Sequence, residues 1–173
     1  MRLSKLIHNI WVIIIAFCIS QKTHAHLIVA QHGTLNVVEE HVFVVLSLPA
    51  SSLLGVDENN DGSLSLTEFN KYRNHISKQV KKHVYLSDQQ YRFSIEGLLL
   101  HPETAHSGNN TFVDQITITG RFTPLMTNNI KFNINLFANN RSKQTYKITA
   151  TNKQQQLIHQ FELEPLSPHS ELF

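Results

Sequence analysis

Cysteine is almost absent from this chain of 173 residues, since the single one is Cys18, within an N-terminal apolar stretch. One cysteine forms no disulfide within the chain and supplies no paired thiolates for a structural zinc site. Motifs of catalysis are missing as well: there is no G-x-S-x-G nucleophile turn, no phosphate loop and no dinucleotide fingerprint. These absences indicate a protein that is not an enzyme and that depends on an apolar core for stability.

The first 25 residues have the three-part layout of a secretory signal peptide. Arg2 and Lys5 give a positive start, an uncharged apolar run extends from Ile10 to Ile19, and Thr23-His24-Ala25 ends in small residues suited to cleavage. The apolar run is too short to cross a bilayer, which requires about 20 residues. We therefore expect cleavage after Ala25 and a protein that is periplasmic or secreted.

Loss of residues 1–25 changes the charge balance. The full chain has 15 Lys and Arg against 13 Asp and Glu, and removal of Arg2, Lys5 and Lys22 leaves 12 basic side chains. Such a chain has no excess of positive charge for binding nucleic acid. Residues 26–173 are numerous enough to bury a core, so we expect a single domain. The expected partners are an ion and another extracytoplasmic or membrane protein.

Most of the mature chain shows the alternation typical of β-strands. Apolar side chains alternate from Thr34 to Val38, and His41 to Leu48 is a dense apolar run typical of a central strand. Asparagine-containing turns separate several of the later runs. These later runs lie near residues 91–95, 116–118, 130–136, 146–150 and 157–163. Six or seven regularly spaced strands predict a mainly β fold, specifically an antiparallel, immunoglobulin-like β-sandwich.

One segment, from Thr67 to about His83, has a helical period instead. Its apolar side chains recur every three or four positions, at Phe69, Tyr72, Ile76 and Val80. The opposite face is basic, with Lys71, Arg73, Lys78, Lys81 and Lys82. Charged residues normally fill the solvent side of an amphipathic helix, and a basic docking surface is the alternative interpretation. We expect this helix within an insertion at about residues 50–84, after the second strand.

The stretch just before this helix, Asp57 to Glu68, fits D-x-[DN]-x-[DN]-G-x₅-E at every fixed position. It resembles the calcium-binding loop of the EF-hand family. The resemblance implies one Ca²⁺ ion, a hard cation that takes six to eight oxygen ligands at about 2.3–2.6 Å. The implied ligands are Asp57, Asn59 and Asp61, the backbone carbonyl of Ser63, Ser65 through a water, and a bidentate Glu68.

Two neighbours of these ligands also agree with the family pattern. Gly62, at the sixth position, permits the positive φ of a sharp turn, and Leu64 places an apolar residue at the eighth. The alternative is an ordinary surface loop, since Asp, Asn, Gly and Ser all favour turns. The agreement of the loop with the following amphipathic helix favours calcium.

The sequence departs from the family pattern in two respects. EF-hand loops usually occur in pairs braced by a short β bridge, but only one loop is present. Pro49 leaves only Ala50 to Val56 for the entering helix, two turns at most. We therefore expect weak binding, in the range of roughly 10⁻⁴–10⁻³ M. A structural role, in which the ion stabilises the folded chain, is then favoured over switching.

An alternative function rests on histidine. Cleavage after Ala25 makes His26 the new N-terminus, whose amine and imidazole together form a chelate suited to copper. The opening His26-Leu27-Ile28 is reminiscent of small periplasmic copper carriers of sandwich fold, with His32 or His41 as candidates for a further ligand. This resemblance implies a periplasmic protein that handles copper or nickel.

A second histidine-rich segment, His101 to His106, differs from a metalloprotease helix. Its spacing does not match H-E-x-x-H, and Pro102 opposes a helix at this place. We interpret the segment as a loop between strands.

Overall fold

The computed structural model describes residues 31–107, 110–124, 129–138 and 144–173. The expected signal peptide, its cleavage site and His26 lie outside the described residues. In the part of the chain that is described, no helix combines the length and the apolar character needed to span a membrane.

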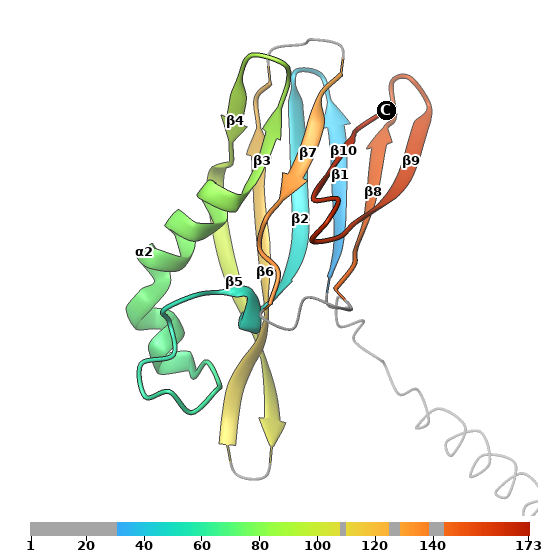
Figure 1. The fold of residues 1–173 in the computed structure, drawn as a ribbon. Helices are drawn as coiled ribbons and strands as arrows, with labels where there is room; N and C mark the ends of the chain where they lie inside the picture. The colour runs from blue at the N-terminus through green and yellow to red at the C-terminus, as the bar shows by residue number, and fades with distance from the viewer. Residues whose placement is uncertain (1–30, 108–109, 125–128, 139–143) are drawn as a thin grey trace, which may run out of the picture.

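The described chain is mainly β, with two sheets, one 3₁₀ turn and one α-helix (Figure 1). Its first half contains β1 (His32–Val38), β2 (His41–Pro49), η1 (Ala50–Ser52), α2 (Leu66–His83), β3 (Val84–Ser87) and β4 (Arg92–Ser94). The second half contains β5 (Glu96–Ser107), β6 (Asn110–Phe122), β7 (Lys131–Ile134), β8 (Tyr146–Asn152), β9 (Leu157–Leu163) and β10 (His169–Glu171). The mainly β prediction is confirmed.

The larger sheet has the strand order β5-β6-β2-β1-β8-β9, and the smaller sheet has the order β10-β7-β3-β4. Strands β1 and β8 run parallel, from His32↔Lys147 to Val37↔Asn152, whereas the other paired strands are antiparallel. The prediction of a purely antiparallel fold is therefore wrong at this pair. The chain passes through β7 of the smaller sheet before it enters β8, and such a crossover is what parallel neighbours require.

Strands β1 and β2 form a hairpin around the two-residue link Glu39-Glu40. Val38 pairs with His41, and Glu39 has a φ of 53°, as tight hairpin turns require at this position. The resulting register places alternate residues of β2 in the core. These buried residues are Val42, Val44, Leu46 and Leu48.

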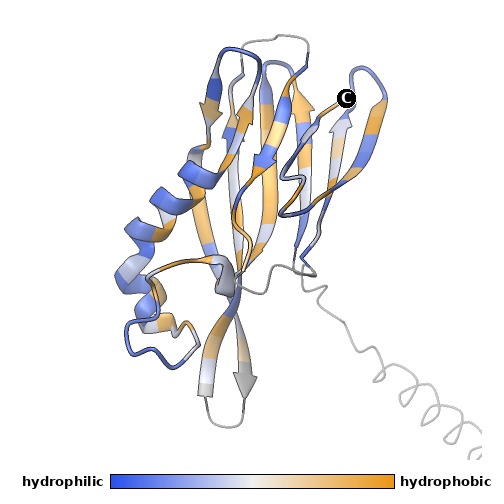
Figure 2. Cartoon of the chain, in the orientation of Figure 1, coloured by the Kyte–Doolittle hydropathy of each residue, from blue (hydrophilic) through white to orange (hydrophobic). Residues whose placement is uncertain are grey.

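Both sheets and the helix contribute to one apolar core. The rings of Phe122 in β6 and Phe132 in β7 meet edge to face across the two sheets, with centroids 6.3 Å apart. The predicted helical stripe is confirmed, because Phe69, Ile76 and Val80 are fully buried. Figure 2 shows the hydrophilic side of α2 turned away from the strands.

Two local predictions are wrong. The segment His101–His106 belongs to strand β5 rather than to a loop. Because β5 is an edge strand, Pro102 is tolerated there despite its missing N–H. The entering helix from Ala50 to Val56 is also absent: only the turn η1 forms, and Gly55 with a φ of 66° interrupts the segment that follows.

Candidate metal centre

The loop Asp57–Glu68 lies between η1 and α2, beside the hairpin of β5 and β6 (Figure 1). Buried apolar side chains anchor it at two points, since Val56 is 3% and Leu64 is 4% exposed. Between these anchors Asp57 is half-buried, and residues 58–63 are exposed. The packing of the chain therefore presents the polar part of the loop to solvent.

The first half of the loop curls around its own amide groups. Asp57 accepts hydrogen bonds from the backbone N–H of Gly62 at 2.9 Å and of Asp61 at 3.2 Å. The Oδ1 of Asn59 also accepts from the N–H of Asp61, at 3.1 Å, and its Nδ2 donates to Asp61 Oδ2 at 2.8 Å. Gly62 has a φ of 81°, the sharp turn that the sequence predicts there. The structure thus brings the first, third and fifth residues of the loop together.

The second half is organised by Glu68, which is 7% exposed. Its Oε2 accepts from the hydroxyl of Ser65 at 2.7 Å and from the Ser65 N–H at 2.9 Å. In return, the Glu68 N–H donates to the Ser65 hydroxyl at 3.2 Å, which completes a capping box at the start of α2. The donors from Ser65, and then the Glu58 N–H, lower the pKa of Glu68 to about 2. This carboxylate is therefore ionised at neutral pH.

Glu58 links the two ends of the loop. Its backbone N–H donates to Glu68 Oε1 at 2.9 Å, and its side chain forms an ion pair with Lys71 of α2. The hydrogen bond with Glu58 raises the pKa of Lys71. Sequence reasoning missed Glu58 because the motif leaves its position free.

The segment that enters the loop is tied to the middle of α2 even though it is not helical. Gln79 donates its Nε2 to the Leu54 carbonyl at 2.8 Å and accepts from the Leu54 N–H at 3.1 Å. His75 Nε2 also lies 3.2 Å from the Leu54 carbonyl oxygen. These contacts hold the non-helical entering segment against α2.

The backbone of Leu64 meets strand β6. The N–H of Val113 donates to the Leu64 carbonyl at 2.7 Å, and the two residues form an isolated antiparallel bridge. Val113 is far from the loop in sequence, so no local pattern could have indicated it.

The donor set can be compared with the needs of a hard cation. In the described part of the chain, no three His, Cys, Asp or Glu side chains form a group that could hold a metal ion. The predicted ligands Asp57, Asp61 and Glu68 are three such acids, so the structure does not gather their carboxylates into one group. The Glu68 oxygens instead accept hydrogen bonds from Ser65 and Glu58. Asp57, Asn59 and Asp61 supply oxygens of the required chemistry from one tight curl.

The histidines suggested as further copper ligands do not lie together. His32 and His41 begin successive antiparallel strands, so they stand at opposite ends of the hairpin. At about 3.3 Å per residue, these ends are about 20 Å apart, too far to share an ion. His41 Nδ1 instead lies 3.2 Å from the Thr123 hydroxyl.

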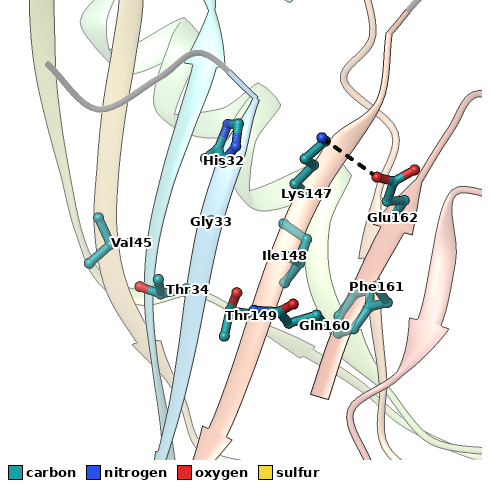
Figure 3. A pocket seen from close by; sticks show the side chains of 10 residues that line it. All are labelled: His32, Gly33, Thr34, Val45, Lys147, Ile148, Thr149, Gln160, Phe161 and Glu162. Atoms are coloured by element: carbon teal, nitrogen blue, oxygen red, sulfur yellow. Dashed lines mark ion pairs between the residues drawn. The ribbon is translucent and has the colours of Figure 1, made fainter. Parts of the chain in front are cut away.

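A separate hollow of about 670 Å³ lies over β1, β8 and β9 of the larger sheet (Figure 3). The only carboxylate among its lining residues is Glu162, whose Oε1 lies 3.9 Å from Lys147 Nζ. A carboxylate that faces an ammonium group is a poor cation ligand. We therefore place the candidate metal centre in the loop Asp57–Glu68.

No protein-family model matches this sequence, and no curated protein matches it either. Its function is therefore inferred from the geometry of the loop.

Proposed function

We propose that this chain is an exported, non-enzymatic protein that binds one calcium ion in the EF-hand-like loop Asp57–Glu68. The scaffold is an immunoglobulin-like sandwich, and the ion has a structural or partner-binding role. The ligands are Asp57, Asn59, Asp61, the carbonyl of Ser63, Ser65 through a water, and Glu68.

The observation that carries this proposal is the curl of the loop around Asp57. The Gly62 N–H donates to this carboxylate, and the positive φ of Gly62 reverses the chain directly after the third predicted ligand. An ordinary surface turn needs neither a twelve-residue span nor a buried acid at its far end. This loop has both, and its buried acid is Glu68. A preformed curl reduces the ordering cost of binding.

The chemistry of the donors favours calcium over softer metals. Oxygen ligands suit hard cations, whereas copper and nickel prefer the nitrogen of an imidazole or the sulfur of a thiolate. All six predicted donors of this loop are oxygens. When bound, the ion would neutralise Asp57, Asp61 and Glu68, and it would stabilise the folded chain by mass action.

Calorimetric titration of the metal-free mature protein with CaCl₂ tests the proposal. We expect a calcium heat in the wild type that disappears in Glu68→Gln, while circular dichroism shows that the β fold is retained. Glu162→Gln is the matched control, because that acid is far from the loop and should leave the heat unchanged. Equal titrations of the wild type and Glu68→Gln would sink the calcium function.

The same titration with CuCl₂ tests the alternative. A copper heat that depends on a free N-terminal His26, established by N-terminal sequencing, supports metal handling through the mature N-terminus.

A further inference from the structure

A lone EF-hand-like loop lacks the second loop that normally braces it, and in this protein strand β6 lies at that place. Leu64, the eighth residue of the loop, forms its β bridge with Val113. Both residues are buried, at 4% and 2% exposure, and the N–H···O distance is 2.7 Å. The bridge is therefore a packed contact rather than an incidental approach.

The register of the larger sheet explains why Leu64 can pair with β6 on the side where β2 ends. Strand β2 pairs with β6 as far as Pro49↔Gln115 and then turns away into η1. Past that pair, Leu64 approaches β6 at Val113, two residues further along. The chain thus returns to the sheet through the loop and continues the line of β2.

The other side of β6 is irregular at the same place. Glu103 pairs with Gln115 but Thr104 pairs with Val113, so Asp114 has no partner across the ladder with β5. Such a bulge bends the strand that contains it. Beyond it, β5 and β6 project past the other strands of the sheet as a two-stranded arm (Figure 1). We define this arm as residues 103–107 and 110–114.

We propose that strand β6 supplies the β bridge that a second EF-hand loop would otherwise provide. The bridge between Leu64 and Val113 then positions the calcium site and couples it to the arm. This inference rests on the proposed function. Leu64 stands between Ser63, whose carbonyl is a predicted ligand, and Ser65, which caps α2. Fixing the backbone of Leu64 therefore fixes the donors on either side of it.

The coupling is reciprocal. An ion that orders the loop holds Leu64 against Val113, and an ordered arm presents Val113 to the loop, since linked equilibria affect each other equally. A two-stranded hairpin alone is marginally stable in water, so the arm is sensitive to this support. Calcium binding should accordingly slow the exchange of amide hydrogens in the arm.

Hydrogen exchange of the full mature chain, with and without CaCl₂, measures this coupling. We expect exchange in the arm to slow about tenfold with calcium in the wild type. Val113→Pro removes the bridging N–H and should abolish the effect of calcium on the arm while weakening calcium binding about tenfold. If the proline variant does not fold, Leu64→Gly is the second test. It keeps the N–H of Val113 but removes the buried side chain that packs the bridge, so it should shift both measurements in the same direction.

Leu66→Gly is the matched control, because it introduces glycine next to the cap without touching the bridge. It should retain the calcium response of the arm. Absence of a calcium heat in the wild type overturns the proposed function together with this inference. A calcium heat without any change in arm exchange overturns the inference alone and leaves calcium binding intact.

Discussion

Ser65 and Glu68 hold each other at the start of α2. The Ser65 hydroxyl donates to Glu68 Oε2 at 2.7 Å, and the Glu68 N–H donates back to that hydroxyl at 3.2 Å. The acid that we expect to bind the ion thus also caps the helix, and the loop and α2 share one residue. This dual use orders the end of the loop without an ion, and it couples the stability of α2 to calcium binding through Glu68.

Replacing Ser65 with alanine should destabilise the metal-free protein by about 1 kcal/mol, because the first turn of α2 loses its side-chain acceptor. Urea unfolding followed by circular dichroism measures the change. Thr67→Ala is the matched control, since Thr67 is an exposed residue in the same turn and is not the cap. Equal midpoints for the two variants would show that the cap contributes nothing to stability.

The low pKa of Glu68 predicts a loss of stability in acid. The pKa falls from 4.5 to about 2 on folding because Ser65 and Glu58 donate hydrogen bonds to the carboxylate. A group with a depressed folded pKa stabilises the protein above its unfolded pKa, and this contribution disappears as the pH falls through the folded value. The metal-free protein should therefore lose stability between about pH 4.5 and pH 2.

Urea unfolding across that pH window, in a buffer with chelator, measures this contribution. Glu68→Gln should have a shallower pH dependence than the wild type, because glutamine does not titrate. Glu162→Gln, which removes an exposed acid, should keep the wild-type slope. Parallel curves for the wild type and Glu68→Gln would contradict the assigned role of Glu68.

The part of the fold that sequence predicted is the part set by local periodicity. The stripe of Phe69, Ile76 and Val80 identified α2, and the apolar run of β2 identified a central strand. Strand β5 was missed because Pro102 and its polar neighbours resemble a loop, and only its edge position in the sheet makes that composition acceptable. The parallel pairing of β1 with β8 depends on a crossover that no local pattern encodes.

The candidate site also has a part that the sequence predicts and a part that only the tertiary fold determines. Asp57, Asn59, Asp61 and Gly62 follow a short motif whose geometry is determined within the loop, so sequence was enough to bring them together. The bridge to Val113 depends on where β2 leaves the sheet, which is a property of the tertiary fold. The ties from Gln79 to Leu54 likewise depend on how the helix docks.

Gly62→Ala should destabilise the protein by about 1–2 kcal/mol through the backbone alone. Gly62 has a φ of 81°, and a Cβ at this position would have no atom within 4 Å, so steric contact does not contribute. Gly62→Asn should cost less, because asparagine adopts a positive φ more readily than alanine. Thermal unfolding of the metal-free variants measures both effects.

Calcium titration then separates the loop from the rest of the chain. Gly62→Ala should weaken calcium binding, whereas Gly97→Ala should not, although Gly97 also has a positive φ and open space around a Cβ. Equal affinities in the two alanine variants would mean that the turn at Gly62 does not shape the ion site.

Tyr146 provides a prediction about the core that is independent of calcium. Its side chain is fully buried, and its hydroxyl donates to the Leu136 carbonyl at 2.7 Å. Tyr146→Phe leaves that carbonyl without its donor and should cost about 1–2 kcal/mol. Burial also raises the pKa of Tyr146 above its ordinary value of 10.0, so the wild type should lose stability as the pH rises above about 10. Unfolding curves at neutral and alkaline pH test both effects. Tyr91→Phe is the control, because Tyr91 is exposed. If Tyr146→Phe matched that control at every pH, the buried hydrogen bond would have no net stabilising effect.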